Sequence, residues 1–128
     1  MAPNVGGGLS VLVVTANPDF ASACEMQLPA HADIDVTTAS TVGDAVDVFV
    51  SESLDCIVSD HDLPDTDGIA FLEAVRAQAP TLPFVLFTTE GSEEITSRAI
   101  SAGVTEYLVK ESHSDQWDRL ATLIEQGV

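Results

Sequence analysis

The sequence has very few basic residues. Its 128 residues include 4 Lys and Arg against 21 Asp and Glu, which gives a formal net charge of −17. Proteins that bind nucleic acid or anionic membranes use a patch of positive charge, and this chain has too few cations to form one. The composition therefore argues against nucleic acid and membrane surfaces as direct partners.

Long apolar runs and cysteines are also scarce. No apolar run approaches the ~20 residues that a membrane-spanning helix needs. The first residues, MAPNVGGGLS, lack a basic region followed by an apolar one, so no signal peptide is expected. We expect residues 1–8 to form a flexible lead-in and the protein to be cytoplasmic. Cys24 and Cys56 lie within apolar patterns, which predicts small buried residues in preference to a disulfide or a metal pair.

The surplus of acid is itself informative, because most of these side chains must lie on solvated faces. Such a surface is typical of halophilic proteins, in which molar salt screens the repulsion between like charges. An ordinary acidic domain is the alternative. Lysine is rarer still, since Lys110 is the only one in the chain. Its position therefore needs a reason.

Hydrophobic periodicity predicts five strands that alternate with five helices. Valine-rich apolar runs are typical of buried strands, and apolar residues at helical spacing mark the segments between them. Asn17 is expected to cap the first helix and Pro29 to stop it, and Gly103 is expected to stop the fourth. The strands are expected at 9–15, 33–38, 54–60, 83–89 and 105–110. The helices are expected at 18–28, from near 40 to 50, from 66 or 67 to 79, at 92–102, and around 117–124.

This alternation predicts the fold class. Apolar strands separated by helices form a parallel sheet with both faces covered, and right-handed crossovers make it a doubly wound α/β sandwich. We therefore expect a flavodoxin-like, three-layer domain spanning residues 9–126.

Ligands of such sheets bind beyond the carboxyl ends of the strands, so the residues there identify the site. The third strand ends in Asp60, the fourth in Thr88 and Thr89, and the fifth in Lys110. A carboxylate can attack phosphorus and form an acyl phosphate, and an ammonium and a hydroxyl can hold phosphoryl oxygens. The pattern thus predicts a phosphoryl-transfer site.

These residues carry a resemblance to a known family. SDHDLPDTDG is similar to the phosphoacceptor loop of response regulator receiver domains, in which Asp is followed by x-x-[Met/Leu]-Pro-x-x-Asp-Gly. FTT and YLVK resemble the family's switch threonine, switch aromatic residue and lysine. The resemblance implies that Asp60 accepts phosphate from a histidine kinase or phosphotransfer protein. It also implies that Thr88 and Lys110 sense the phosphate, and that Tyr107 relays the change to an output partner on the face of the fourth helix, fifth strand and fifth helix.

The sequence departs from this family at the metal site. The first strand normally ends in two adjacent acids that bind Mg²⁺, and here those positions hold Thr15 and Ala16. Asp60 and the backbone carbonyl of Asp62 remain, so we expect a weakened Mg²⁺ site. Thr89 replaces the small residue that usually follows the switch threonine. Glu111 replaces the proline that usually follows the lysine.

Other acids and histidines near the site have simpler explanations. Asp65 and Asp67 are expected to be turn and capping residues, because the spacing does not fit a calcium-binding loop. Glu90 lies where the family tunes dephosphorylation, and a solvated acid explains it equally well. His61 lies beside the acceptor, but neither a metal role nor a phosphate relay is expected of it.

Three alternatives to a phosphorylated receiver stay open at this stage. A pseudo-receiver, which binds partners independently of phosphate, is favoured by the loss of the acid pair. A phosphohydrolase of the haloacid-dehalogenase type also uses D-x-D at a strand end, but after its first strand, so we expect no enzyme. A flavin carrier of the flavodoxin type would need a hydroxyl-rich phosphate loop, which TANPDF is not.

Overall fold

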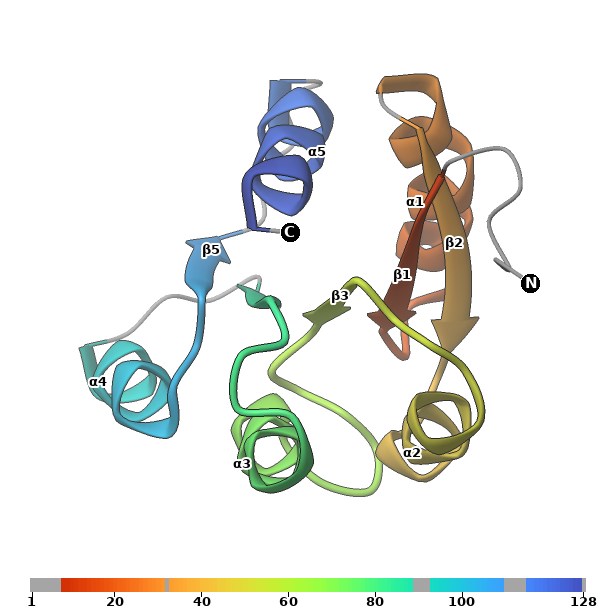
Figure 1. Cartoon of the computed structure of the whole chain (residues 1–128). Coiled ribbons are helices and arrows are strands. Elements are labelled where there is room, and N and C mark those ends of the chain that lie inside the picture. Colours follow the sequence, from red (N-terminus) through yellow and green to blue (C-terminus); the bar gives the residue numbers. More distant parts are fainter. Residues whose placement is uncertain (1–7, 32, 89–92, 110–114, 128) are drawn as a thin grey trace.

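The computed structural model describes residues 8–31, 33–88, 93–109 and 115–127, and it contains the expected alternation of strands and helices (Figure 1). The strands are β1 (Leu9–Val14), β2 (Ile34–Ala39), β3 (Cys56–Ser59), β4 (Phe84–Thr88) and β5 (Glu106–Val109). The helices are α1 (Pro18–His31), α2 (Val42–Ser51), α3 (Gly68–Gln78), α4 (Glu93–Ala102) and α5 (Asp115–Gly127). The fold class predicted from the sequence is confirmed.

All neighbouring strands pair in parallel, in the order β2-β1-β3-β4-β5. The chain moves outward from β1 to β2, then returns past β1 and continues through β3 to β5. The strand order thus reverses beside β1 and β3. Ligands of doubly wound sheets bind at such a reversal, beyond the carboxyl ends of the strands.

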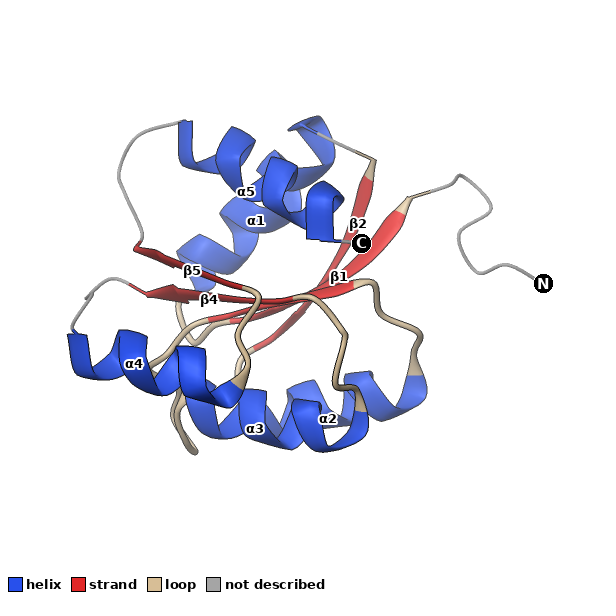
Figure 2. Ribbon diagram, turned by 60° about the vertical axis from the view of Figure 1, so that its left-hand side comes forward, coloured by secondary structure: helices blue, strands red, loops and turns tan. Residues whose placement is uncertain are grey.

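Helices cover both faces of the sheet, with α1 and α5 on one side and α2, α3 and α4 on the other (Figure 2). Strand residues alternate between the two faces. Val11 and Val13 pack in the α1 and α5 layer, whereas Leu12 and Val14 pack in the opposite layer. Both faces of β1 are therefore buried from residue 11 to 14, which is why these four residues are all apolar.

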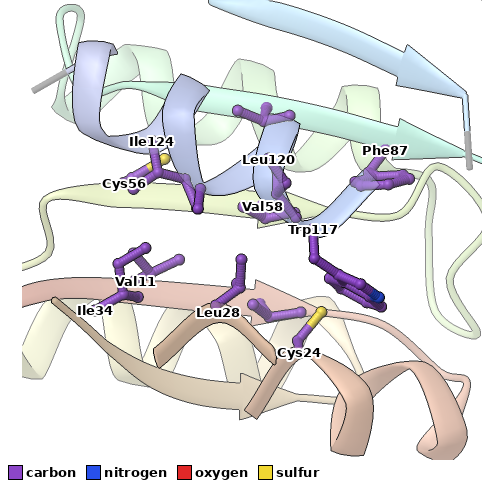
Figure 3. Close-up of a cluster of buried hydrophobic side chains, with 13 residues drawn as sticks. Val11, Cys24, Leu28, Ile34, Cys56, Val58, Phe87, Trp117, Leu120 and Ile124 are labelled. Carbon is purple, nitrogen blue, oxygen red and sulfur yellow. The ribbon is translucent and has the colours of Figure 1, made fainter. Parts of the chain in front are cut away.

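The layer formed by α1 and α5 packs on the sheet through one cluster of buried apolar side chains (Figure 3). Cys24 and Leu28 of α1 lie in one cluster with Trp117 and Leu120 of α5. The Phe20 ring stacks on Trp117 with a centroid separation of 5.6 Å. Both cysteines are fully buried and neither forms a disulfide, as the sequence predicted.

The prediction that Pro29 ends the first helix is wrong, because α1 continues to His31. Proline lacks only its own N–H, so later residues can still bond to carbonyls four positions earlier. In the last turn of a helix this loss affects a single bond. Gly103 follows α4 with φ of 93°, which agrees with its predicted place at the end of that helix. Thr41 caps α2 by accepting from the Asp44 N–H, close to the expected start near residue 40.

None of the helices in the described ranges is both long and apolar enough to cross a membrane.

Candidate functional site

Asp60 follows β3, the middle strand, at its carboxyl end. Its backbone N–H donates to the carbonyl of Val14, so it extends the ladder between β3 and β1. The residue is only 9% exposed. The carboxylate is thus held at the end of the most buried part of the sheet.

The loop after Asp60 folds back on it, and Gly68 makes this possible. A Cβ atom at position 68 would lie 2.2 Å from the Asp60 carbonyl oxygen and 2.8 Å from Leu86 Cδ1. The Gly68 N–H donates to the carbonyl of His61 at 2.7 Å, and Asp62 and Asp67 form an isolated bridge. The glycine of the sequence motif is therefore required because two backbone segments approach closely here.

Two acids of this loop are caps, as the sequence predicted, but they serve different helices. Asp67 is the N-cap of α3 and accepts from the Ala70 N–H at 2.8 Å. Asp65 instead accepts from the N–H groups of Val42 and Gly43 at the start of α2, each at 3.0 Å. These two hydrogen bonds lower the pKa of Asp65 below its ordinary value, and the bond from Val42 has the largest effect.

The caps fasten the loop after Asp60 to neighbouring helices. Asp65 joins it to α2, and a carboxylate oxygen of Asp67 lies 3.6 Å from the guanidinium of Arg98 in α4. The partner of Asp65 lies more than twenty residues away in sequence, in a different helix. No local signal could have identified it, because capping rules refer only to a residue's own helix.

Thr15 lies next to Asp60, at the carboxyl end of β1. It is 2% exposed, and its hydroxyl donates to Asp60 Oδ2 at 2.5 Å. The Thr15 hydroxyl oxygen in turn accepts from the Asn17 N–H at 3.1 Å. Asn17 also caps α1, as predicted, by accepting from the N–H groups of Asp19 and Phe20. The first strand thus delivers a hydroxyl to Asp60, at a position where the family that the sequence resembles normally has an acid.

A pocket of about 330 Å³ opens beside this hydroxyl, at the ends of β1 and β2. The described residues that line it carry no charge: Thr15, Ala16, Pro18, Ala21, Thr38, Ala39 and Ser40. Within the described ranges, no three His, Cys, Asp or Glu side chains gather as a possible metal-binding group. The groups in the described ranges that could bind a metal ion at this site are therefore the Asp60 carboxylate, hydroxyls and backbone carbonyls.

The predicted switch residues are placed in part. Thr88 ends β4 opposite Val109 of β5, so its backbone lies at the same sheet edge as Asp60. Tyr107 of β5 packs its ring against the α2–α4 layer. Its hydroxyl is buried and has no hydrogen-bond partner in the described part of the chain. Lys110 lies outside the described residues, as do Thr89, Glu90 and Glu111.

His61 is the residue whose environment the sequence did not reveal. It is 9% exposed, and its Nδ1 is buried without a hydrogen-bond partner among the described residues. A polar residue in an acidic loop is normally exposed. The available signal was its place directly after a buried strand, where the chain has not yet left the core.

Fold and site together define a doubly wound α/β domain with a buried aspartate beyond the middle strand. Residues 11–122 match the family model of the response regulator receiver domain. The chain therefore belongs to this family.

Relatives and solved structures agree with this assignment. The chain is 33% identical over 120 residues to the bacterioopsin transcriptional activator of Halobacterium salinarum, covering 93% of this chain and 17% of that protein. It is 32% identical over 84 residues to the regulatory protein LuxO of Vibrio cholerae, covering 66% of this chain and 18% of that protein. The chain thus spans less than a fifth of the length of these relatives.

The structure superposes on the chemotaxis protein CheY4 of Vibrio cholerae with a TM-score of 0.85 and 26% identity, covering 94% of this chain and 99% of that one. A CheY-like receiver domain from Methanospirillum hungatei gives a TM-score of 0.84 at 20% identity, covering 94% of this chain and 96% of that one. The second likeness concerns the fold alone.

Proposed function

We propose that this receiver domain accepts a phosphoryl group on Asp60 from a histidine kinase or phosphotransfer protein. The observation that carries the proposal is the placement of Asp60. It is a buried carboxylate beyond the middle strand of the sheet, and the loop after it closes through Gly68. No other carboxylate is buried in the described ranges.

In the proposed reaction, an oxygen of the Asp60 carboxylate attacks the phosphorus of a phosphohistidine. A new O–P bond forms as the P–N bond breaks, and the electron pair stays on the imidazole nitrogen, which takes one proton from solvent. The product is an acyl phosphate on Asp60. The buried strand end holds the attacking group in place, so little conformational entropy is lost when the donor docks.

We assign Thr88 and Lys110 to sensing the phosphoryl oxygens, and Tyr107 to relaying the change toward α4, β5 and α5. The position of Thr88 at the end of β4 supports its part in this. The Tyr107 hydroxyl is buried without a hydrogen-bond partner among the described residues. An unsatisfied buried group costs free energy, so outward movement of this hydroxyl to water is favoured. An output partner on the α4–β5–α5 face would detect that movement.

We further propose that Mg²⁺ binds weakly. Mg²⁺ prefers carboxylates and water in octahedral geometry. Asp60 and the Asp62 backbone carbonyl are the donors proposed here, while Thr15 and Ala16 supply no charge. When bound, Mg²⁺ would neutralise the negative charge of the phosphoryl group. Replacement of both residues by aspartate (Thr15→Asp with Ala16→Asp) should therefore raise Mg²⁺ affinity sharply in calorimetry, and tight binding by the unaltered chain would contradict the proposal.

A pseudo-receiver that binds partners independently of phosphate is the second candidate. The hydrogen bond from Thr15 to Asp60 favours it, because part of the carboxylate is already occupied. The losses at Thr15 and Ala16 favour it also. The intact Asp60, Thr88 and Lys110 favour the first candidate.

Intact-mass spectrometry after incubation with a phosphodonor distinguishes the two. The phosphorylated receiver should show one phosphate adduct that hydroxylamine removes, with or without Mg²⁺. The Asp60→Asn variant should show none. An unmodified mass under every condition would favour the pseudo-receiver, and an adduct that survives Asp60→Asn or maps to His61 would refute Asp60 as the acceptor.

A further inference from the structure

The contact between Thr15 and Asp60 is the feature of the site that the proposed reaction does not explain. The hydroxyl donates to Asp60 Oδ2 at 2.5 Å, and both residues are buried. A hydroxyl donor to a carboxylate makes a charge-assisted hydrogen bond, which is stronger than a bond between neutral groups. This contact therefore constrains the carboxylate before any phosphodonor arrives.

The surroundings of Thr15 fix the direction of its proton. Its backbone N–H donates to the carbonyl of Ala39 at 2.9 Å, which extends the β1–β2 ladder. Its hydroxyl oxygen accepts from the Asn17 N–H, whose position is set by the start of α1. One lone pair of the hydroxyl is thus used, and its proton is directed to Asp60. The group is arranged as a donor to Asp60 and not as a free oxygen ligand.

We propose that the Thr15 hydroxyl takes the place of the metal ion at Asp60. It orients the carboxylate without a cation, and it competes with Mg²⁺ for the lone pairs of Oδ2. This inference rests on the proposed function for its biological meaning. The uncharged pocket beside Thr15 agrees with it, because the described residues that line this pocket provide no acid that would draw a cation in.

The proposal makes a prediction whose sign separates it from the obvious alternative. A threonine hydroxyl can also be an oxygen ligand of Mg²⁺, and in that case its removal would weaken cation binding. If the hydroxyl instead competes with the cation for the carboxylate, its removal takes away this competitor and strengthens cation binding. Loss of a donor to a charged group typically changes an equilibrium by about tenfold or more.

The test compares Thr15→Ser with Thr15→Ala, because serine and alanine differ only by the hydroxyl. Mg²⁺ is titrated into each variant by calorimetry in high KCl. The same titration of each variant combined with Asp60→Asn is subtracted, which removes the weak binding of Mg²⁺ to the acidic surface. We expect Asp60-dependent affinity to be about tenfold higher for Thr15→Ala than for Thr15→Ser. Thr15→Ser should match the unaltered protein.

Two results would overturn the proposal. A higher affinity for Thr15→Ser would show that the hydroxyl is a ligand, and equal affinities, including none for both, would show that it has no effect on the cation. Denaturant unfolding checks that each variant is folded, and Thr15→Val removes the same donor if the alanine variant is not.

A second measurement separates this inference from the proposed function. Phosphoramidate labelling of Asp60 is measured with Mg²⁺ and with EDTA, and the ratio of the two rates should be higher for Thr15→Ala than for Thr15→Ser. If no variant is labelled while the affinities differ as expected, the phosphoacceptor proposal fails and the role of Thr15 stands. If all variants are labelled with the same ratio of rates and their Mg²⁺ affinities are equal, the phosphoacceptor proposal stands and the role of Thr15 fails.

Discussion

Gly68→Ala should destabilise the protein and displace Asp60. The new Cβ would lie 2.2 Å from the Asp60 carbonyl oxygen and 3.1 Å from its carbonyl carbon. Both atoms belong to backbone, which cannot rotate away as a side chain can. Leu86 Cδ1 at 2.8 Å adds a second obstacle, in the core beneath the loop. The loop must therefore move outward and weaken the bond from the Gly68 N–H to His61.

The size of the effect follows from two opposing contributions. Forcing an extra methyl group into a packed site costs about 1–3 kcal/mol, and contact with backbone favours the upper end. Alanine also restricts the unfolded chain, which returns about 0.4–1 kcal/mol. We expect a net loss of about 2 kcal/mol in the free energy of unfolding. For a domain of this size, that lowers the thermal midpoint by about 8 °C, at about 4 °C for each kcal/mol.

Gly43→Ala is the matched control. Gly43 lies in the first turn of α2, and a Cβ there would meet its nearest atoms, from Asp65 and Thr41, at an ordinary 3.8 Å. Because alanine favours helix over glycine, this change should stabilise the protein by about 0.5–1 kcal/mol. Urea unfolding of both variants provides the comparison. Equal stabilities of the two variants would refute the close approach at Gly68.

Three further predictions concern other contacts. The amides of Val42 and Gly43 lower the pKa of Asp65 from its ordinary value of 3.8, so Asp65 stabilises the fold above that value and ceases to do so as pH falls through its lower folded-state pKa. Asp65→Asn should thus be less stable at neutral pH and match the unaltered protein in strong acid, and a difference that persists in acid would contradict this. Arg76→Met removes the hydrogen bonds that the guanidinium donates to the carbonyls of Gly103 and Ala79, at 2.8 and 3.0 Å. Urea unfolding should show a loss of about 1–2 kcal/mol in the free energy of unfolding. The thermal midpoint should rise more with molar KCl than with sucrose of equal osmolality, because salt screens a net charge of −17 and sucrose does not; equal effects would remove the support for a halophilic protein.

The fold was predictable because its signals are local and repeated. The central strands are apolar runs, and the helices carry apolar residues at helical spacing, with capping or stop residues near several of their ends. The position of the candidate site was predicted from topology, since the strand ends that lead to Asp60 and Thr88 lie at one edge of a parallel sheet. The error at Pro29 came from treating a helix breaker in the last turn as if it lay in the interior.

The contacts within the site were not predictable, because they join segments that are distant in sequence. Thr15 was identified as a missing acid, but nothing in TANPDF shows that its hydroxyl donates to Asp60. Asp65 was identified as a cap, but its partner is another helix. In both cases the residue type was read correctly, and the partner depended on how the loops pack after the sheet forms.

The two buried thiols have a practical consequence for measuring motion. Burial raises the pKa of Cys56 to about 12, and neither Cys24 nor Cys56 is exposed in the folded protein. Because a thiol reagent reacts with the thiolate, modification requires the protein to open first. Cys24 lies on α1 and Cys56 lies on β3, so their modification rates report two different openings. Faster reaction at Cys24 than at Cys56 would show that α1 separates from the sheet while β3 stays paired, and equal rates would show that the layer and the sheet open as one unit.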